Sequence, residues 1–249
     1  MQNLFLVFCF LYMVSGASAA WSRNVFPPHP RLRLTPTELN KVRQVTASDP
    51  IAAGMLRSIT TAGNRLLTAP TLVHNKSGPG QLLGVAGGFV NRMYTLGFLH
   101  RLCNGTDARW AARAVVEMRS IANFSDWNPA HFLDTAEMSH GIAIGYDWAF
   151  DAIAAEDRRL IEGAVLRNGF GAFLKSIRAR DTWARGDWNW NQVVHGGMTT
   201  AALAFVDCTL TPGLADAAKM TLEASTSGLT AAFASYAPQG AWPEGAGYW

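Results

Sequence analysis

The chain of 249 residues has few charged side chains. Asp, Glu, Lys and Arg together make up 16% of it, and the formal net charge is only +3. Nucleic-acid-binding proteins concentrate Lys and Arg on one face or in blocks, so this balance argues against nucleic acid as a partner. Hydrophobic residues make up 49% of the sequence, which is typical of a globular protein with a sizeable core.

The chain also lacks the short motifs that mark several enzyme classes. There is no Gly-x-Ser-x-Gly turn, so Ser139 and His140 have no support as part of a hydrolase triad. No phosphate-binding loop or dinucleotide-binding glycine motif follows a strand. The Glu-x-x-His motif of di-iron bundles occurs once, at Glu137 to His140, whereas those proteins need it twice. We therefore expect no cofactor and no metal ion.

Cysteine is scarce as well. Of the three cysteines, Cys9 lies in an N-terminal segment that we expect to be removed, which leaves Cys103 and Cys208. This even count permits one disulfide in an oxidising compartment, and two buried free thiols are the alternative. No Cys-x-x-Cys or Cys/His spacing indicates a zinc site.

The N-terminal segment 1–20 has the pattern of a secretory signal peptide. An apolar run from Leu4 to Val14 is followed by Ala17, Ser18 and Ala19, small residues of the kind that precede a cleavage site. The run is about half the ~20 residues that a membrane-spanning helix needs. We therefore expect a secreted or secretory-pathway protein with no membrane association after cleavage. Three glycosylation sequons fit this export route, at Asn75, Asn104 and Asn123.

No segment of the chain shows a convincing strand pattern, whereas apolar residues at three- and four-residue spacing predict successive helices. Thr35, Pro36 and Glu38 have the arrangement of a capping box, and Asp49 with Pro50 opens the next helix. Helices joined by short turns pack as antiparallel hairpins, which leaves a bundle, a solenoid or an α/α toroid open. The predicted helices span about 36–47, 50–67, 81–102, 107–122, 130–150, 156–179, 191–207 and 213–236.

Polar residues gather in three segments near predicted helix starts: 131–148, 187–198 and 236–249. In the first segment, Asp134, Glu137 and His140 are spaced to form one stripe on a helix. Three interpretations are open for this stripe: acidic residues favoured by the helix dipole, a substrate contact, or a metal site. Tryptophans also gather near helix ends, where their rings could line an open end of the assembly or seal the core: Trp127, Trp183, Trp188, Trp190 and Trp242.

The polar segments, taken with the first predicted helix, resemble the N-terminal toroid of the heparinase II/III-like polysaccharide lyases. This family includes alginate lyases and is related to dermatan sulfate epimerase. The resemblance spans nearly all of residues 21–249 and is carried by "HPRLRLTPTELNKVRQVTASDP", "FLDTAEMSHGIAIGYDW", "NWNQVVHGGM" and "GAWPEGAGYW". It implies an all-α fold, an incomplete (α/α) toroid of antiparallel helical hairpins. In the family a β-sandwich follows the toroid, so we expect this chain to be a C-terminally truncated member.

The resemblance implies that the protein cleaves a uronic-acid-containing polysaccharide, such as alginate or a glycosaminoglycan, by β-elimination. This reaction needs donors that neutralise the uronate carboxylate, a base, and an acid for the departing oxygen. The family pattern places the neutralising group at Asn191 and the acid at Tyr248, with His195 as a second donor or the base. Residues expected to bind substrate are Gln192, Trp190, Glu244, Asp134, Glu137 and His140. Lys175, Arg178, Arg180 and Arg185 could attract a polyanion or simply complement helix ends.

Two other functions remain open. An α/α-barrel glycoside hydrolase would use paired carboxylates, with Asp134 or Glu137 opposite Glu244. A non-catalytic carbohydrate-binding remnant would keep the aromatic residues without turnover.

Overall fold

The helix starts follow the capping chemistry expected from the sequence. The computed structural model describes residues 26–76, 80–236 and 240. At the start of α2, the Thr35 hydroxyl accepts from the Glu38 backbone while the Glu38 carboxylate accepts from the Thr35 N–H at 2.7 Å. The Asp49 carboxylate accepts from the first backbone N–H groups of α3, and Asp107 caps α5 in the same way. The predicted capping box and the predicted Asp49 cap are both confirmed.

The regular secondary structure of the described residues consists of helices, without a strand, so the all-α prediction is confirmed. The predicted helix ends agree with the observed ones to within a few residues. The α-helices are α2 (Pro36–Ser48), α3 (Pro50–Leu66), α4 (Leu83–Leu102), α5 (Ala108–Ala122), α6 (Phe132–Trp148), α7 (Ala155–Ala164), α8 (Ala172–Ala179), α9 (Asn189–Phe205) and α10 (Leu214–Leu229). Shorter turns are η1 (Phe150–Ala152), η3 (Thr182–Arg185) and η4 (Thr230–Tyr236), all 3-10 helices.

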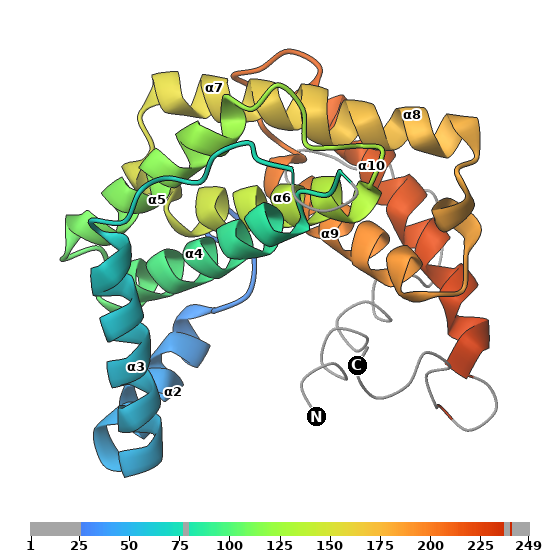
Figure 1. Cartoon of the computed structure of the whole chain (residues 1–249). Helices are drawn as coiled ribbons and strands as arrows, with labels where there is room; N and C mark the ends of the chain where they lie inside the picture. The colour runs from blue at the N-terminus through green and yellow to red at the C-terminus, as the bar shows by residue number, and fades with distance from the viewer. Residues whose placement is uncertain (1–25, 77–79, 237–239, 241–249) are drawn as a thin grey trace.

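The predicted helix over 156–179 is continuous but not uniform. A π-helical turn, η2 (Val165–Gly171), joins α7 to α8, so the three segments form one rod across the top of the molecule (Figure 1). The rod ends where Arg180 adopts a left-handed conformation with φ of 59°. Periodicity alone predicted the extent of the rod, but a π turn shifts the hydrogen bonding by one residue and leaves no clear mark in the sequence.

The helices alternate between two layers along the chain. Helices α4, α6 and α9 lie side by side, and α5, the α7–α8 rod and α10 pack over them (Figure 1). Within the first layer, α4 and α6 meet at their N-terminal ends, where the Leu82 N–H bonds Asp134. Helices α6 and α9 meet at both ends, through His131 with Trp190 and through Tyr146 with Phe205. The three helices therefore run in the same direction.

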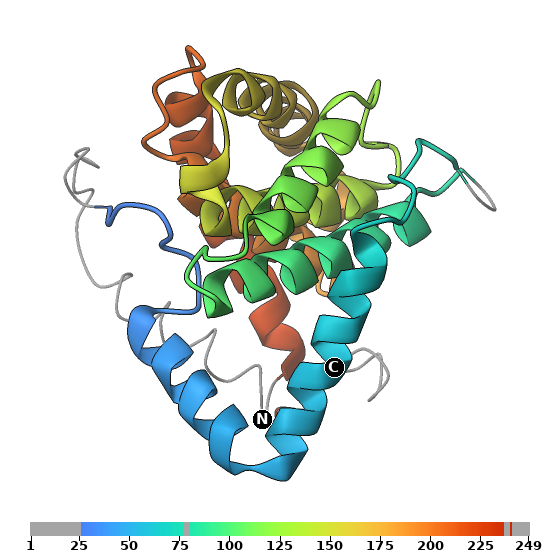
Figure 2. The ribbon, with the colours of Figure 1, turned by 90° about the vertical axis from the view of Figure 1, so that its left-hand side faces the viewer.

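Glycines let the first-layer helices approach closely, as their small-residue composition predicts. A Cβ on Gly197 of α9 would lie 2.7 Å from the carbonyl oxygen of Ala136 on α6, and a Cβ on Gly141 of α6 would lie 2.7 Å from the Phe89 ring on α4. Helix α6 is the central helix, since fourteen of its seventeen residues are buried. Helices α2 and α3 form a hairpin that projects from the two layers (Figure 2).

Cys103 and Cys208 are both free thiols in this structure, and both are partly rather than fully buried, so only the free-thiol part of that alternative holds. Among the helices that the structure describes, none is long and apolar enough to cross a membrane. The predicted signal peptide, residues 1–20, lies outside the described residues, as does Trp242.

Candidate functional site

The N-terminal ends of α4 and α6 are joined through the buried carboxylate of Asp134. This carboxylate accepts hydrogen bonds from the Leu82 N–H at 2.7 Å and the Asn128 side-chain amide at 2.7 Å, and it lies 3.0 Å from His131 Nδ1. Asp134 is completely inaccessible to solvent. It lies in the first turn of α6, where the helix dipole also favours a negative charge. In this structure Asp134 therefore holds the helix ends together, and its carboxylate is not accessible from solvent.

The first turn of α9 packs against the same region. The indole of Trp190 lies edge-on to the imidazole of His131, with ring centroids 4.9 Å apart. Trp127 and Trp183 are almost fully buried, whereas Trp188 and Trp190 remain partly exposed. Of the two roles open for these tryptophans, Trp127 and Trp183 seal the core.

Asn191 and His195 lie one turn apart on α9, and both are fully buried on the side that faces α10. The Asn191 amide donates to the Gly228 carbonyl at 3.1 Å, and its Oδ1 has no partner among the described residues. His195 Nε2 lies 3.2 Å from the Ala184 carbonyl, so Nε2 carries the proton and Nδ1 is an unpaired acceptor. Burial lowers the pKa of His195, against a smaller opposing effect of the Ala184 carbonyl, so the ring is neutral near pH 7.

Gln192 points away from this buried pair. Its amide nitrogen donates to the Tyr236 hydroxyl at 2.8 Å, and that hydroxyl lies 3.2 Å from Gln192 Oε1. Both residues are partly exposed. This contact joins η4 to the N-terminal part of α9, in the segment "NWNQVVHGGM" that carries the family resemblance.

Helix α6 carries a second group of predicted site residues on its partly exposed face. Leu133, Glu137 and His140 are the three residues of α6 that are not buried, and their spacing puts them on one stripe. Of the predicted stripe, only Glu137 and His140 lie on this partly exposed face. Asp134 is buried and bonds to residues at the N-terminal ends of α4 and α6.

His140 on this stripe pairs with a tyrosine that the sequence pattern did not single out. The Tyr94 hydroxyl on α4 lies 2.8 Å from His140 Nε2. Burial, and then the charge of Arg33, lower the pKa of His140 to about 4, so its imidazole is neutral at physiological pH. Burial raises the pKa of Tyr94, although Arg33 opposes this. Tyr94 lies in the middle of an Ala- and Gly-rich helix, and no local motif singles it out.

Glu137 lies one turn before His140 on α6, and no described residue forms a hydrogen bond with its carboxylate. A Cβ on Gly87 of α4 would be 3.4 Å from Glu137 Oε2, so the missing side chain leaves room for the carboxylate against α4. Burial and the nearby Asp134 charge raise the pKa of Glu137, while His131 lowers it. A raised carboxyl pKa brings such a group toward the range of a general acid or base.

The structure therefore divides the described candidates into four groups. Asp134 and Trp190 both contact His131 at the helix ends, and Glu137 and His140 lie on one face of α6. Gln192 pairs with Tyr236, and Asn191 and His195 lie buried where α9 faces α10. Tyr248 and Glu244 lie outside the described residues.

Neither of two sequence comparisons identifies the chain. No model of a known protein family matches it, and no curated protein matches its sequence. Functional assignment consequently depends on the chemistry of the described side chains and on the motif resemblance.

Basic residues are exposed near the start of α9. Lys175 and Arg178 lie on α8, and Arg180 and Arg185 lie in the segment leading to α9. All four are exposed, and none forms an ion pair with another described residue. Their charge is thus available to a polyanion, although isolated solvated cations are also common on protein surfaces.

Proposed function

We propose that this protein is a secreted polysaccharide lyase of the heparinase II/III-like type, acting on a uronic-acid-containing chain by β-elimination. The motif resemblance carries the proposal, and the structural observation that supports it is the Tyr94–His140 contact of 2.8 Å, with Glu137 one turn away on the same partly exposed face of α6. These residues supply a hydroxyl paired with a neutral imidazole and, one turn away on α6, a carboxylate, and these are group types that can transfer protons in such a reaction.

In β-elimination, a base removes the proton on the carbon next to the uronate carboxylate, and the electron pair forms a double bond to the neighbouring carbon. The glycosidic oxygen on that carbon leaves and takes a proton from an acid. Negative charge builds up on the carboxylate before the bond breaks, so nearby hydrogen-bond donors speed the reaction. Amide, imidazole and phenol groups can carry out these steps.

The proposed fold is an incomplete (α/α) toroid, with α4, α6 and α9 as inner helices and α5, the α7–α8 rod and α10 as outer helices. The alternation of the two layers along the chain supports it, as does the common direction of the first-layer helices. In such an arrangement, the inner helices would present Glu137, His140 and Gln192 toward the substrate. The exposed Lys and Arg residues before α9 would attract the polyanion.

Asn191 and His195 remain the proposed carboxylate-neutralising groups, with Tyr248 as the proposed acid. This assignment has a structural requirement, because the Asn191 amide is bonded to the Gly228 carbonyl and both side chains are buried. For either group to reach a substrate, the end of α10 at Gly228 must move away from α9. The movement breaks the Asn191–Gly228 hydrogen bond, and it lets the two unpaired acceptors, Asn191 Oδ1 and His195 Nδ1, find donors on the substrate or in water.

The decisive experiment incubates the purified chain with alginate, chondroitin sulfate, dermatan sulfate and heparan sulfate. The expected result is a rise in ultraviolet absorbance from the unsaturated uronate product on at least one of them. We expect Tyr248→Phe and Asn191→Ala to lower the rate at least 100-fold, which corresponds to ~3 kcal/mol of transition-state stabilisation. Val193→Ala is the matched control, because Val193 is an exposed neighbour on the same turn and offers no polar group.

A glycoside hydrolase is the second candidate, favoured by the raised pKa of Glu137. Asp134 is a poor partner for it, since that carboxylate is buried and already hydrogen-bonded. New reducing ends without ultraviolet absorbance would indicate hydrolysis and rule out the lyase. Retention on a polysaccharide column without cleavage would indicate a carbohydrate-binding protein.

A further inference from the structure

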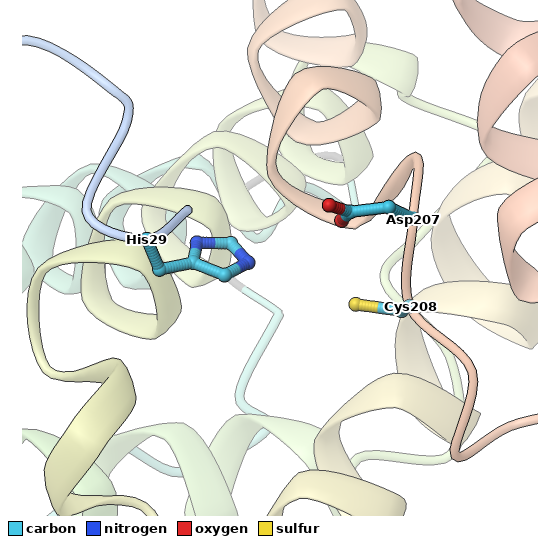
Figure 3. A group of neighbouring side chains, drawn as sticks. All are labelled: His29, Asp207 and Cys208. Atoms are coloured by element: carbon cyan, nitrogen blue, oxygen red, sulfur yellow. The ribbon is translucent and has the colours of Figure 1, made fainter. Parts of the chain in front are cut away.

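At the opposite ends of the first-layer helices, the chain brings together three side chains that could ligate a metal ion. His29 belongs to the segment before α2, while Asp207 and Cys208 directly follow α9. One ligand atom from each lies within 4.8 Å of the other two. Figure 3 shows the side chains of His29 and Cys208 pointing toward one another, with the Asp207 carboxylate beside them.

We propose that His29, Asp207 and Cys208 form a site for a borderline transition-metal ion such as Zn²⁺, which fastens the N-terminal segment to the end of α9. The ligand set of one imidazole, one carboxylate and one thiolate suits this ion, whereas Mg²⁺ and Ca²⁺ prefer oxygen ligands alone. Tetrahedral zinc bonds of 2.0–2.3 Å place ligand atoms ~3.5 Å apart, so the three groups need to close by ~1 Å.

A second observation points to the same site, because His29 is already held in the orientation that a metal ligand needs. Its Nδ1 lies 2.5 Å from Asp147 Oδ1, and the ring stacks on Phe150 with centroids 4.1 Å apart. With the Nδ1 proton directed at the Asp147 carboxylate, Nε2 keeps its lone pair. A carboxylate behind a ligating histidine is the usual outer-shell arrangement in metalloproteins.

Asp147 is itself rigidly placed. It is fully buried and accepts backbone hydrogen bonds from Arg31 at 2.9 and 3.0 Å and from Leu32 at 2.8 Å. The same carboxylate thus fixes both the backbone of the N-terminal segment and the His29 ring. This rigidity lowers the ordering cost that ion binding would otherwise carry.

A third observation is the buried carboxylate of Glu162 near the Cys208 thiol, one of whose oxygens accepts no hydrogen bond. Glu162 is 1% exposed, accepts from the Tyr146 hydroxyl at 2.7 Å, and has no partner for its Oε2. The Tyr146 hydroxyl also lies 3.7 Å from Cys208 Sγ. An unpaired carboxylate oxygen in this position adds negative potential where a cation would bind.

Arg31 is the competing cation. Its guanidinium contacts Asp207 Oδ2 at 2.9 Å, which leaves Oδ1 for the ion. The sequence predicted no metal site, because metal-binding motifs are recognised by ligands at short spacing, and His29 is separated from Asp207 and Cys208 by nearly the whole helical domain.

The test uses the whole purified chain, treated with a chelator and then titrated with Co²⁺ and Zn²⁺. We expect one equivalent of Co²⁺ to produce a thiolate-to-cobalt charge-transfer band in the near ultraviolet, and Zn²⁺ to abolish that band by displacement. Millimolar Mg²⁺ should not compete. The melting temperature should rise with Zn²⁺.

Variants separate this site from adventitious binding. Cys208→Ser should abolish the charge-transfer band and weaken Zn²⁺ binding at least tenfold, and His29→Gln should weaken it similarly. Cys103→Ser is the matched control, because it removes the other partly buried free thiol. His74→Ala removes the partly exposed His74–Asp126 pair, and it should also bind normally.

The proposal is overturned if the wild-type chain gives no charge-transfer band, or if the band survives in Cys208→Ser or disappears in Cys103→Ser. Circular dichroism in the absence of metal checks that each variant folds, and Asp207→Asn is the substitute if one does not. Because the readout is metal binding and not cleavage, the result is independent of the lyase proposal.

Discussion

The imidazole of His195 occupies the space that a side chain on Gly228 would need. A Cβ built at Gly228 would overlap the His195 ring, which also packs against the rings of Phe173 and Trp183. Glycine on α10 is thus what allows α10 to lie against α9 while His195 stays between them. The same close approach brings the Gly228 carbonyl within 3.1 Å of the Asn191 amide.

We predict that Gly228→Ala lowers the free energy of unfolding by about 1–3 kcal/mol, because the packed His195 ring has no room to move away from the added methyl group. Urea denaturation followed by circular dichroism measures the change. Gly196→Ala is the matched control, since a Cβ there meets nothing within 4 Å. A more helix-favouring residue at Gly196 should raise stability by up to ~1 kcal/mol. Equal effects of the two substitutions would contradict the observed packing.

Asp134→Asn is expected to lower the free energy of unfolding by about 2 kcal/mol, because a neutral amide oxygen is a weaker acceptor than the carboxylate for the Leu82 N–H and the Asn128 amide, and an NH2 group replaces the oxygen beside His131 Nδ1. Asp216→Asn provides the comparison, since the Asp216 side chain is 84% exposed and its nearest cation is 3.9 Å away. That change should stay within about 0.5 kcal/mol. A small effect at Asp134 would mean that the helix ends are held together by apolar packing alone.

Stability should fall in mild acid partly through His140. Its pKa is lowered from 6.5 in the unfolded chain to about 4 in the folded protein, so the unfolded state takes up the proton first as pH decreases. The contribution of His140 to the free energy of unfolding is fully present above pH 6.5 and decreases from there to about pH 4. The loss amounts to ~3 kcal/mol over that interval.

The check is a series of urea titrations between pH 4 and pH 7.5 on the wild type and His140→Gln. The variant cannot titrate at this position, while its amide can still pair with Tyr94. We expect a shallower loss of stability with falling pH in the variant. Parallel curves would show that His140 is not the residue responsible. His195 and His100, whose pKa values are also lowered by burial, account for part of the remaining slope.

Glycosylation provides a test of the predicted secretory route. Asn75, Asn104 and Asn123 are all exposed. Expression in a secreting eukaryotic cell should therefore give a product whose electrophoretic mobility increases after treatment with an N-glycosidase. Replacing the three asparagines by glutamine one at a time should remove the shift in steps. Retention inside the cell with no glycosidase-sensitive shift would argue against the predicted signal peptide.

The helices could be read from the sequence because their signals are local. Thr35 with Glu38 and Asp49 with Pro50 are caps within one turn of the residues they serve, and the apolar spacing of the long segments reports burial directly. The π turn at Val165–Gly171 was missed, because the residue pattern differs little from that of an ordinary helix.

The candidate site was less predictable, because sequence spacing gives the face of a helix but not what covers it. Asp134, Glu137 and His140 have stripe spacing, yet Asp134 is buried among three polar neighbours and His140 finds its partner on another helix, in Tyr94. Gln192 and Asn191 are adjacent in the chain, but one reaches Tyr236 and the other reaches Gly228.

By itself, the sequence determined the all-α class, the order and approximate ends of the helices, and the small residues that let them pack closely. These properties depend on backbone preferences and periodicity within single segments. Only the tertiary structure decided that His195 is buried under Gly228, that Tyr94 meets His140, and that His29 lies beside Asp207 and Cys208. Each of these contacts joins segments distant in the chain, and its geometry depends on how whole helices are positioned against one another.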